Sequence, residues 1–313
     1  MSATPDSTLD KRPSLAPKHW PVWLGVGCCV LLARLPWRLQ RALGKALGPL
    51  LGVLSRSRRQ VAARNIALCF PELSASEQAQ LLRESFQQLG IGLFEFARAW
   101  WGSVTPMQGH VQVEGLEHLA AAQAGGRGVI IISGHFVTLE MAARLMCAHA
   151  PLAGMYRPHD TGPMEWAVRR GRMRYASAMF TREELRPALR HLKQGGLLWF
   201  APDQDTRRGD SVYVPFFGQI AYSLTSTHQL ARLSGASVLG FAHIRNADGS
   251  YRLRLTPALA DFPSADATAD TARVMALIET MIRAAPEQYL WIHRRFKRQP
   301  GQPDNALYAP QDQ

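Results

Sequence analysis

Apolar residues recur along the chain in two patterns, one typical of strands and the other typical of helices. Residues 129–132, Val-Ile-Ile-Ile, form a continuous β-branched run such as a strand buried on both faces requires. The sequence Ser74-Ala-Ser-Glu77 is a capping box, which predicts that a helix begins there. Apolar residues follow it at helical spacing as far as Phe96. The chain after about residue 55 therefore carries both periodicities.

The two patterns alternate through the rest of the chain. Further strands are predicted at residues 111–114, 152–156, 196–201, 237–243 and 251–255. Helices are predicted to end near residue 124 and to cover residues 136–149, 165–174, 183–193, 222–234 and 268–284. Asn246-Ala-Asp-Gly249 predicts a hairpin turn. Alternating strands and helices predict an α/β fold, for which 313 residues, 47% of them hydrophobic, provide an ample core.

The first 54 residues differ from this pattern and are predicted to form a separate segment, with a catalytic domain over residues 55–313. Residues 20–33 are an uncharged run, shorter than the roughly 20 apolar residues of a membrane span. Residues 37–54 predict an amphipathic helix with basic residues largely off its leucine stripe. The stripe consists of Leu39, Leu43, Leu47, Leu50 and Leu54. We expect this segment to bind a membrane; a signal peptide and an ordinary surface helix are the alternatives.

Charge supports the membrane interpretation. The chain has 36 Lys and Arg against 24 Asp and Glu, a net charge of +12, and residues 11–71 include eleven basic residues, among them Lys11 and Arg12, but no acidic one. Such a block predicts an anionic partner: nucleic acid, anionic lipid or an acidic protein. The aromatic residues lie beside the apolar run and are not interleaved with the basic ones, so we expect anionic membrane lipid and no nucleic acid. More basic residues follow the run than precede it, which favours a main domain on the cytoplasmic side.

The candidate chemistry centres on His135 and Glu140, at a predicted turn from strand to helix. Histidine accepts a proton near neutral pH, and a carboxylate on its other ring nitrogen would fix the tautomer. Positions five apart on a helix differ by about 140°, so Glu140 can orient His135 only if His135 lies in the entry turn. Taken alone, this spacing is a weak signal. The four cysteines have no metal-binding spacing, and we predict neither a metal nor a cofactor.

Several segments, in order along the chain, resemble the bacterial lipid A biosynthesis acyltransferases, and the lauroyl type in particular, within the glycerolipid acyltransferase superfamily. They are Ser133-Gly-His-Phe-Val-Thr-Leu-Glu140, Met155-Tyr-Arg-Pro158, Gly171-Arg-Met-Arg174, Ala201-Pro-Asp-Gln-Asp205, Val214-Pro-Phe-Phe-Gly218 and Ala285-Pro-Glu-Gln-Tyr-Leu-Trp-Ile-His-Arg-Arg-Phe-Lys297. Glu140, where related enzymes have Asp, matches the lauroyl type. The resemblance implies an α/β fold with a mixed central sheet flanked by helices.

The resemblance also implies a reaction at the bacterial inner membrane, in which an acyl chain passes from acyl carrier protein to a hydroxyl of a Kdo-bearing lipid A precursor. His135 would be the general base and Glu140 its orienting partner. The remaining candidate substrate-binding residues are Arg157, Arg172, Arg174, Asp203, Asp205, Arg294 and Arg295. A glycerophospholipid acyltransferase and a non-catalytic, membrane-tethered basic binding protein are the alternatives.

Overall fold

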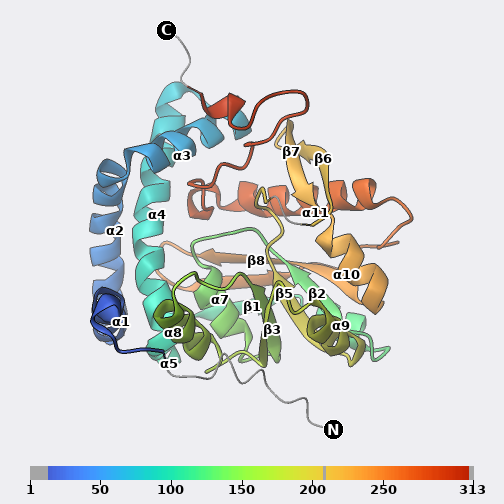
Figure 1. The fold of residues 1–313 in the computed structure, drawn as a ribbon, viewed down its shortest axis with the longest axis horizontal. Helices are drawn as coiled ribbons and strands as arrows, with labels where there is room; N and C mark the ends of the chain where they lie inside the picture. Colours follow the sequence, from blue (N-terminus) through green and yellow to red (C-terminus); the bar gives the residue numbers. More distant parts are fainter. Residues whose placement is uncertain (1–12, 207–208, 310–313) are drawn as a thin grey trace.

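A mixed seven-stranded sheet forms the centre of the computed structural model, which describes residues 13–206 and 209–309 (Figure 1). Its strands are β1 (Val111–Glu114), β2 (Val129–Ile132), β3 (Leu152–Tyr156), β4 (Ala178–Thr181), β5 (Leu197–Phe200), β8 (Ser237–Arg245) and β9 (Tyr251–Leu255). Their order is β1-β9-β8-β2-β5-β3-β4, parallel from β8 to β4, with β9 antiparallel to β8. The predicted α/β fold with a mixed sheet is confirmed.

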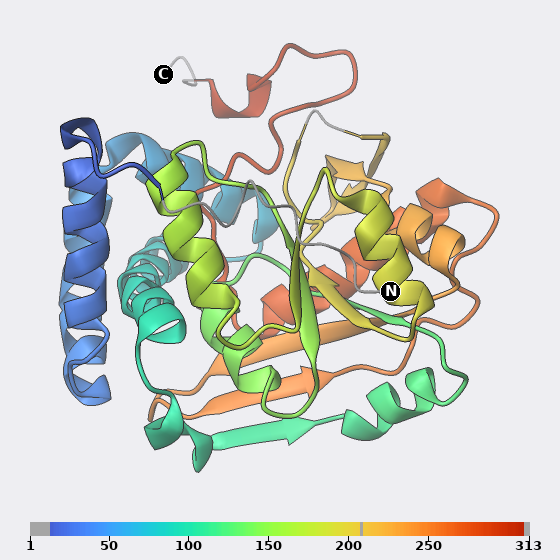
Figure 2. The same ribbon diagram turned by 60° about the horizontal axis from the view of Figure 1, so that its bottom comes forward.

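Helices cover both faces of the sheet (Figure 2). They are α1 (Trp20–Leu32), α2 (Trp37–Leu54), α3 (Arg56–Cys69), α4 (Ala75–Trp101), α5 (Thr105–Gln108), α6 (Leu116–Gln123), α7 (Leu139–Met146), α8 (Gly162–Arg172), α9 (Leu185–Lys193), α10 (Ser226–Ser234) and α11 (Ala267–Ala284). Short 3-10 turns cover Pro17–His19, Pro286–Gln288 and Ala306–Tyr308. Residues 1–12 of the predicted N-terminal segment, including Lys11 and Arg12, lie outside the described residues.

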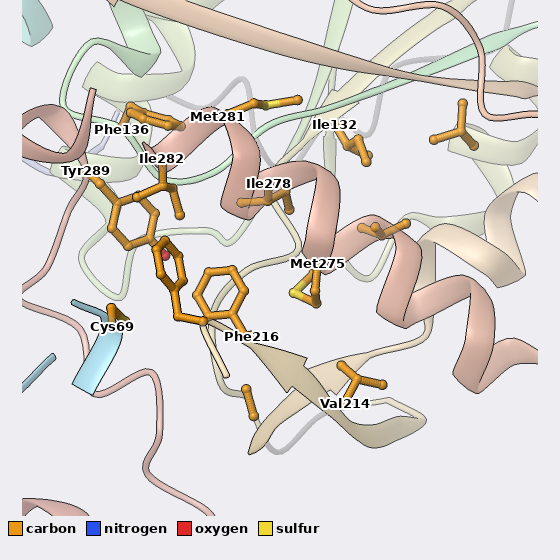
Figure 3. Packing of buried hydrophobic residues seen from close by; sticks show 14 of the residues in the cluster. Cys69, Ile132, Phe136, Val214, Phe216, Met275, Ile278, Met281, Ile282 and Tyr289 are labelled. Carbon is orange, nitrogen blue, oxygen red and sulfur yellow. The ribbon is translucent and has the colours of Figure 1, made fainter. Parts of the chain in front are cut away.

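The β-branched run of β2 is buried on both faces, as predicted. Ile130 and Ile132 join a core cluster with α9, α10 and α11, whereas Val129 and Ile131 join a second cluster with α6 and α7. Figure 3 shows part of the first cluster, in which α11 packs near Phe136 and Tyr289. The central strand is therefore fixed from both sides, which gives the turn that follows it a rigid base.

Most predicted elements are present, and the differences have local causes. The capping box at Ser74 begins α4 as predicted, and the predicted turn at residues 246–249 joins β8 to β9. The helix predicted over residues 222–234 was wrong at its start, because β6 (Ser211–Phe216) and β7 (Gln219–Leu224) pair as a hairpin there. Phe217 and Gly218 both have positive φ, as a two-residue hairpin turn requires. Neither this hairpin nor α3 nor β4 was predicted.

The packing of α2 is opposite to that of an ordinary surface helix. Gly44 and Gly48 face α4 so closely that an added Cβ would lie 2.5 Å and 2.1 Å from its backbone. The leucines of the predicted stripe lie mostly on the exposed side. Both α1 and α2 pack against α4 at one edge of the molecule (Figures 1 and 2). Within residues 13–206 and 209–309, no helix combines the length and the apolar character that a membrane span requires.

Candidate active site

Two neighbouring parallel strands bring His135 and Asp203 together. Ile132 of β2 lies beside Phe200 of β5, and each of the two functional residues follows three positions later. The Nδ1 atom of His135 is 2.5 Å from Oδ1 of Asp203. The carboxyl ends of parallel strands meet at one edge of a sheet, where ligand sites of α/β proteins collect.

Asp203 is fully buried and is held as a carboxylate. Its Oδ2 accepts hydrogen bonds from the backbone amide of His135 at 2.9 Å and from the hydroxyl of Tyr289 at 2.7 Å. Burial opposes ionisation, but the interactions with His135 and Tyr289 outweigh it and hold the pKa of Asp203 below its ordinary range. The carboxylate therefore accepts the Nδ1 proton of His135. This leaves Nε2 of His135 as a proton acceptor, the arrangement of a general base.

The turn that carries His135 is anchored by the segment after α11. The amide of Leu290 donates to the carbonyl of His135, and the amide of Val137 donates to the carbonyl of Gln288, both at 2.9 Å. These bonds keep residues 135–138 out of the helix, so α7 begins only at Leu139. The expectation that His135 lies in a non-helical entry turn is confirmed.

The expected contact between Glu140 and His135 is not formed. Glu140 is buried and accepts hydrogen bonds from Nε1 of Trp100 at 2.6 Å, from the hydroxyl of Tyr175 at 3.0 Å and from Nε of Arg172 at 3.0 Å. Burial alone would raise the pKa of Glu140, but Arg172 and the other donors lower it below its ordinary value. The carboxylate that contacts His135 is instead that of Asp203, because β5 lies beside β2 and places Asp203 next to the imidazole ring.

A large cavity opens beside the His135–Asp203 pair. Its volume is about 960 Å³, and His135, Glu140 and Arg172 line it together with many apolar side chains. The apolar lining includes Leu139, Ala143, Leu152, Gly154, Met179 and Trp199. A cavity of this size, lined mostly by apolar side chains, accommodates a hydrocarbon chain.

Two of the predicted binding arginines line this cavity. Arg157 is exposed at its rim and pairs with Asp160 at 3.3 Å. Arg172 is largely buried, and its charge is neutralised by Glu140. Arg157 can therefore bind an anionic ligand if its weak surface ion pair with Asp160 breaks, whereas Arg172 is fixed in the cavity wall by Glu140.

The other three arginines lie away from the cavity. Arg174 is exposed and donates to a backbone carbonyl of α4 at 2.9 Å. Arg294 is exposed and donates to Asn305 at 2.9 Å. Arg295 is buried, where it donates to Ser223 at 2.6 Å and to the carbonyl of Tyr222 at 2.7 Å. Arg295 is therefore part of the core and does not line the cavity.

Sequence reasoning identified Asp203 and Asp205 but not their partners. Asp205 lines the cavity and forms an ion pair with Arg298 at 2.6 Å. Its backbone amide donates to Nε2 of His293, which also lines the cavity, at 3.2 Å. The roles of Tyr289 and His293 were missed, although both lie in the conspicuous segment 285–297; its composition alone did not show that it folds back onto the strand ends.

A histidine–aspartate pair at the strand ends beside a large, mostly apolar cavity is typical of an enzyme that acts on a substrate with a hydrocarbon chain. Comparison with known proteins specifies this further. Residues 9–298 match the family described as bacterial lipid A biosynthesis acyltransferase, and the chain belongs to that family.

Curated relatives agree along almost their whole length. The chain is 40% identical over 291 residues to the lipid A biosynthesis palmitoleoyltransferase of Escherichia coli (strain K12), covering 92% of this chain and 95% of that protein. It is 37% identical over 288 residues to the lauroyltransferase of the same organism, covering 91% and 94%. The myristoyltransferase of that organism is 26% identical over 291 residues, covering 91% and 90%. The protein is an acyltransferase of lipid A biosynthesis.

Proposed function

We propose that the protein transfers a fatty acyl chain from acyl carrier protein to a hydroxyl group of a Kdo-bearing lipid A precursor, with His135 as the general base. The observation that carries this proposal is the His135–Asp203 pair beside the large, mostly apolar cavity. Nε2 of His135 would remove the hydroxyl proton, and the alkoxide would attack the thioester carbonyl directly. The thiolate would leave and take the proton back from His135.

In this proposal the two carboxylates have different tasks. Asp203 orients His135 and stabilises the imidazolium as it forms. Glu140 acts through Arg172, which it holds in the wall of the cavity that His135 also lines. Glu140 is therefore a positioning residue, and its contribution does not require contact with His135.

Support for acyl carrier protein as the donor comes from charge near the cavity. Leu185 of α9 lines the cavity, and the same helix carries the exposed basic residues Arg186, Arg190 and Lys193. Acyl carrier protein is strongly acidic, and complementary charge favours its encounter with such a helix. Arg157 at the rim would add to this attraction or would meet a phosphate of the acceptor.

We also propose that α1 and α2, the N-terminal helix pair, attach the enzyme to the inner membrane with its catalytic domain in the cytoplasm. Trp20 and Leu24 of α1 and Leu50 and Leu54 of α2 are more than half exposed. Exposed large apolar side chains on helices that also carry basic residues are typical of a lipid-binding face. The lipid acceptor would then reach the cavity from the membrane.

Incubation of the purified protein with acyl carrier protein thioesters and the lipid precursor, followed by mass spectrometry, tests the reaction. We predict that His135→Ala and Asp203→Asn each lower kcat about 10²–10⁴-fold, the usual contribution of a positioned base. His118→Ala, at a partly exposed position of α6 outside the cavity lining, is the matched control and should retain full activity. Full activity of His135→Ala, or transfer to lysophospholipids in preference to the lipid A precursor, would contradict the proposal.

A further inference from the structure

A second imidazole, that of His293, lines the same cavity as His135. The two rings are held by one loop, which follows β5. Asp203 in this loop accepts a hydrogen bond from His135, whereas the backbone amide of Asp205 donates a hydrogen bond to Nε2 of His293 at 3.2 Å. The loop therefore accepts a hydrogen bond from the ring of His135 and donates a hydrogen bond to the ring of His293.

The bond from Asp205 determines the tautomer of His293. Because Nε2 accepts a hydrogen bond, it carries no proton, and the proton of the neutral ring must lie on Nδ1. Among the residues that the structure describes, no hydrogen bond to this Nδ1 is formed. His293 thus has an N–H group at Nδ1, on a ring that lines the cavity, whereas the unprotonated nitrogen of His135 is Nε2.

Burial keeps the ring of His293 uncharged. It lowers the pKa of His293 to about 4, and a positive charge on His135 lowers it further, although Asp203 acts in the opposite direction. At neutral pH, His293 is therefore a hydrogen-bond donor and not a competing base. A neutral imidazole donor can polarise a carbonyl group without giving up its proton.

The backbone of His293 is fixed as firmly as its ring. Its carbonyl accepts hydrogen bonds from the side-chain amide of the buried Asn65 at 2.7 Å and from the amide of Arg295 at 2.9 Å. A donor held by contacts to the ring and to the backbone needs little reorganisation when charge develops nearby. This preorganisation is what makes such donors effective in transition-state stabilisation.

We propose that His293 is a catalytic residue whose Nδ1–H group donates a hydrogen bond to the thioester carbonyl oxygen. His135 takes the proton of the acceptor hydroxyl as the new C–O bond forms, and the carbonyl oxygen becomes an oxyanion that accepts the bond from His293. The oxyanion then collapses, the C–S bond breaks, and the thiolate receives the proton from His135. His293 keeps its proton throughout. This role rests on the acyl transfer proposed above.

Two amide substitutions separate this role from a structural one. In His293→Asn the amide nitrogen occupies the position of Nδ1, so the donor to the cavity is kept and the bond to Asp205 is lost. In His293→Gln the amide oxygen reaches the position of Nε2, so the bond to Asp205 is kept and the donor at Nδ1 is lost. His293→Phe removes both groups at similar volume. His118→Asn, on the surface of α6, is the matched control.

We expect His293→Phe and His293→Gln to lower kcat about 10²–10³-fold, the usual effect of losing one such donor, with little change in KM for either substrate. His293→Asn should recover at least tenfold of that loss. Recovery by Gln and not by Asn, a change in KM alone, or parental kcat in all three variants would overturn the assignment. Thermal unfolding of each variant identifies a fold defect. Absence of transfer by the parent protein would instead contradict the proposed function, so the two failures are distinguishable.

Discussion

Glu140 and Asp203 are both buried carboxylates close to His135 in sequence or in space, yet their partners give them different properties. Asp203 faces a histidine that can change its charge, and Glu140 faces an arginine that cannot. Only the His135–Asp203 pair can therefore take up and release a proton during a reaction. The family resemblance, more than the spacing, implied Glu140 as the partner of His135, but the partner is 68 positions away along the chain.

The pair of Glu140 and Arg172 should also contribute to the stability of the fold. Glu140→Gln leaves the largely buried guanidinium of Arg172 without a counter-charge, and we expect the free energy of unfolding to fall by about 3 kcal/mol. Arg172→Met in the same chain should restore much of this loss, because it removes the unpaired charge. Urea unfolding of the two single variants and the double variant measures the coupling. Strict additivity of the two single effects would show that the pair is not coupled.

Protonation of a buried histidine should make the fold sensitive to acid. Burial lowers the pKa of His243 from its ordinary 6.5 to about 3. Between these values the unfolded chain binds a proton that the folded chain does not, so stability falls as the pH falls below 6.5. We expect His243→Phe, which fits among Phe136, Trp199 and Phe241, to weaken this dependence.

Urea unfolding at pH 7.5 and pH 4.5 tests this expectation. The loss of unfolding free energy between the two should be smaller in His243→Phe by about 2.7 kcal/mol, because one group contributes about 1.4 kcal/mol per pH unit between pH 6.5 and pH 4.5. Thr138 still has a partner, because its hydroxyl also donates to the carbonyl of residue 243 at 3.2 Å. Parallel pH curves for the two proteins would contradict the buried, neutral state of His243.

The sequence was sufficient to place His135 and Asp203 each after a strand, but not to pair them. Their meeting depends on β5 lying beside β2, although β3 and β4 come between them in the chain. Strand order results from how the intervening helices pack, and no local pattern encodes it. The positions of Arg174, Arg294 and Arg295 were not predictable for the same reason, since only packing decides whether an arginine reaches the cavity or the core.

At the scale of elements, α2 shows that an apolar stripe at helical spacing can lie on the exposed face of a helix as well as on the buried one. Its leucines recur at helical spacing, and so do Gln40, Gly44, Gly48 and Gly52 on the buried side. A water-soluble helix would bury the leucines. Here the glycines allow close backbone approach to α4, and the leucines remain exposed. Sequence periodicity predicted the helix and its apolar stripe but could not show which face packs against the protein.

Close packing of α2 should make Gly48 intolerant of a side chain. A Cβ at this position would lie 2.1 Å from the carbonyl oxygen of Phe86, so Gly48→Ala must push α2 away from α4. We expect a loss of unfolding free energy of about 1–3 kcal/mol, typical of overpacking, together with faster proteolysis of α2. Gly27→Ala in α1 is the matched control, because nothing lies within 4 Å of its Cβ. Higher helix propensity should leave that variant unchanged or slightly stabilised. Equal behaviour of the two variants would contradict the close crossing.

At the scale of the whole molecule, the N-terminal helix pair forms one edge, beside the sheet and the helices that cover it (Figure 2). Because α4 contacts α2, α7 and α8, it connects the exposed apolar edge to the elements that carry Glu140 and Arg172. Deleting the first 54 residues would therefore uncover α4 as well as remove the apolar surface. A test of membrane binding must change the exposed face alone and keep the packing of α2.

Two substitutions on the exposed face provide that test. Leu24→Glu and Leu50→Glu change side chains that are 71% and 51% exposed, so the fold should be retained. If each leucine contributes about 1.5 kcal/mol on entering the lipid, the double variant should bind vesicles containing anionic lipid about a hundredfold more weakly. Leu116→Glu, an exposed position on α6, should bind like the parent protein. High salt should weaken the parent only partly, because the basic residues of the pair contribute about 1 kcal/mol each while the apolar contribution persists. Co-sedimentation of the double variant to the same extent as the parent would show that this edge is not the membrane-binding surface.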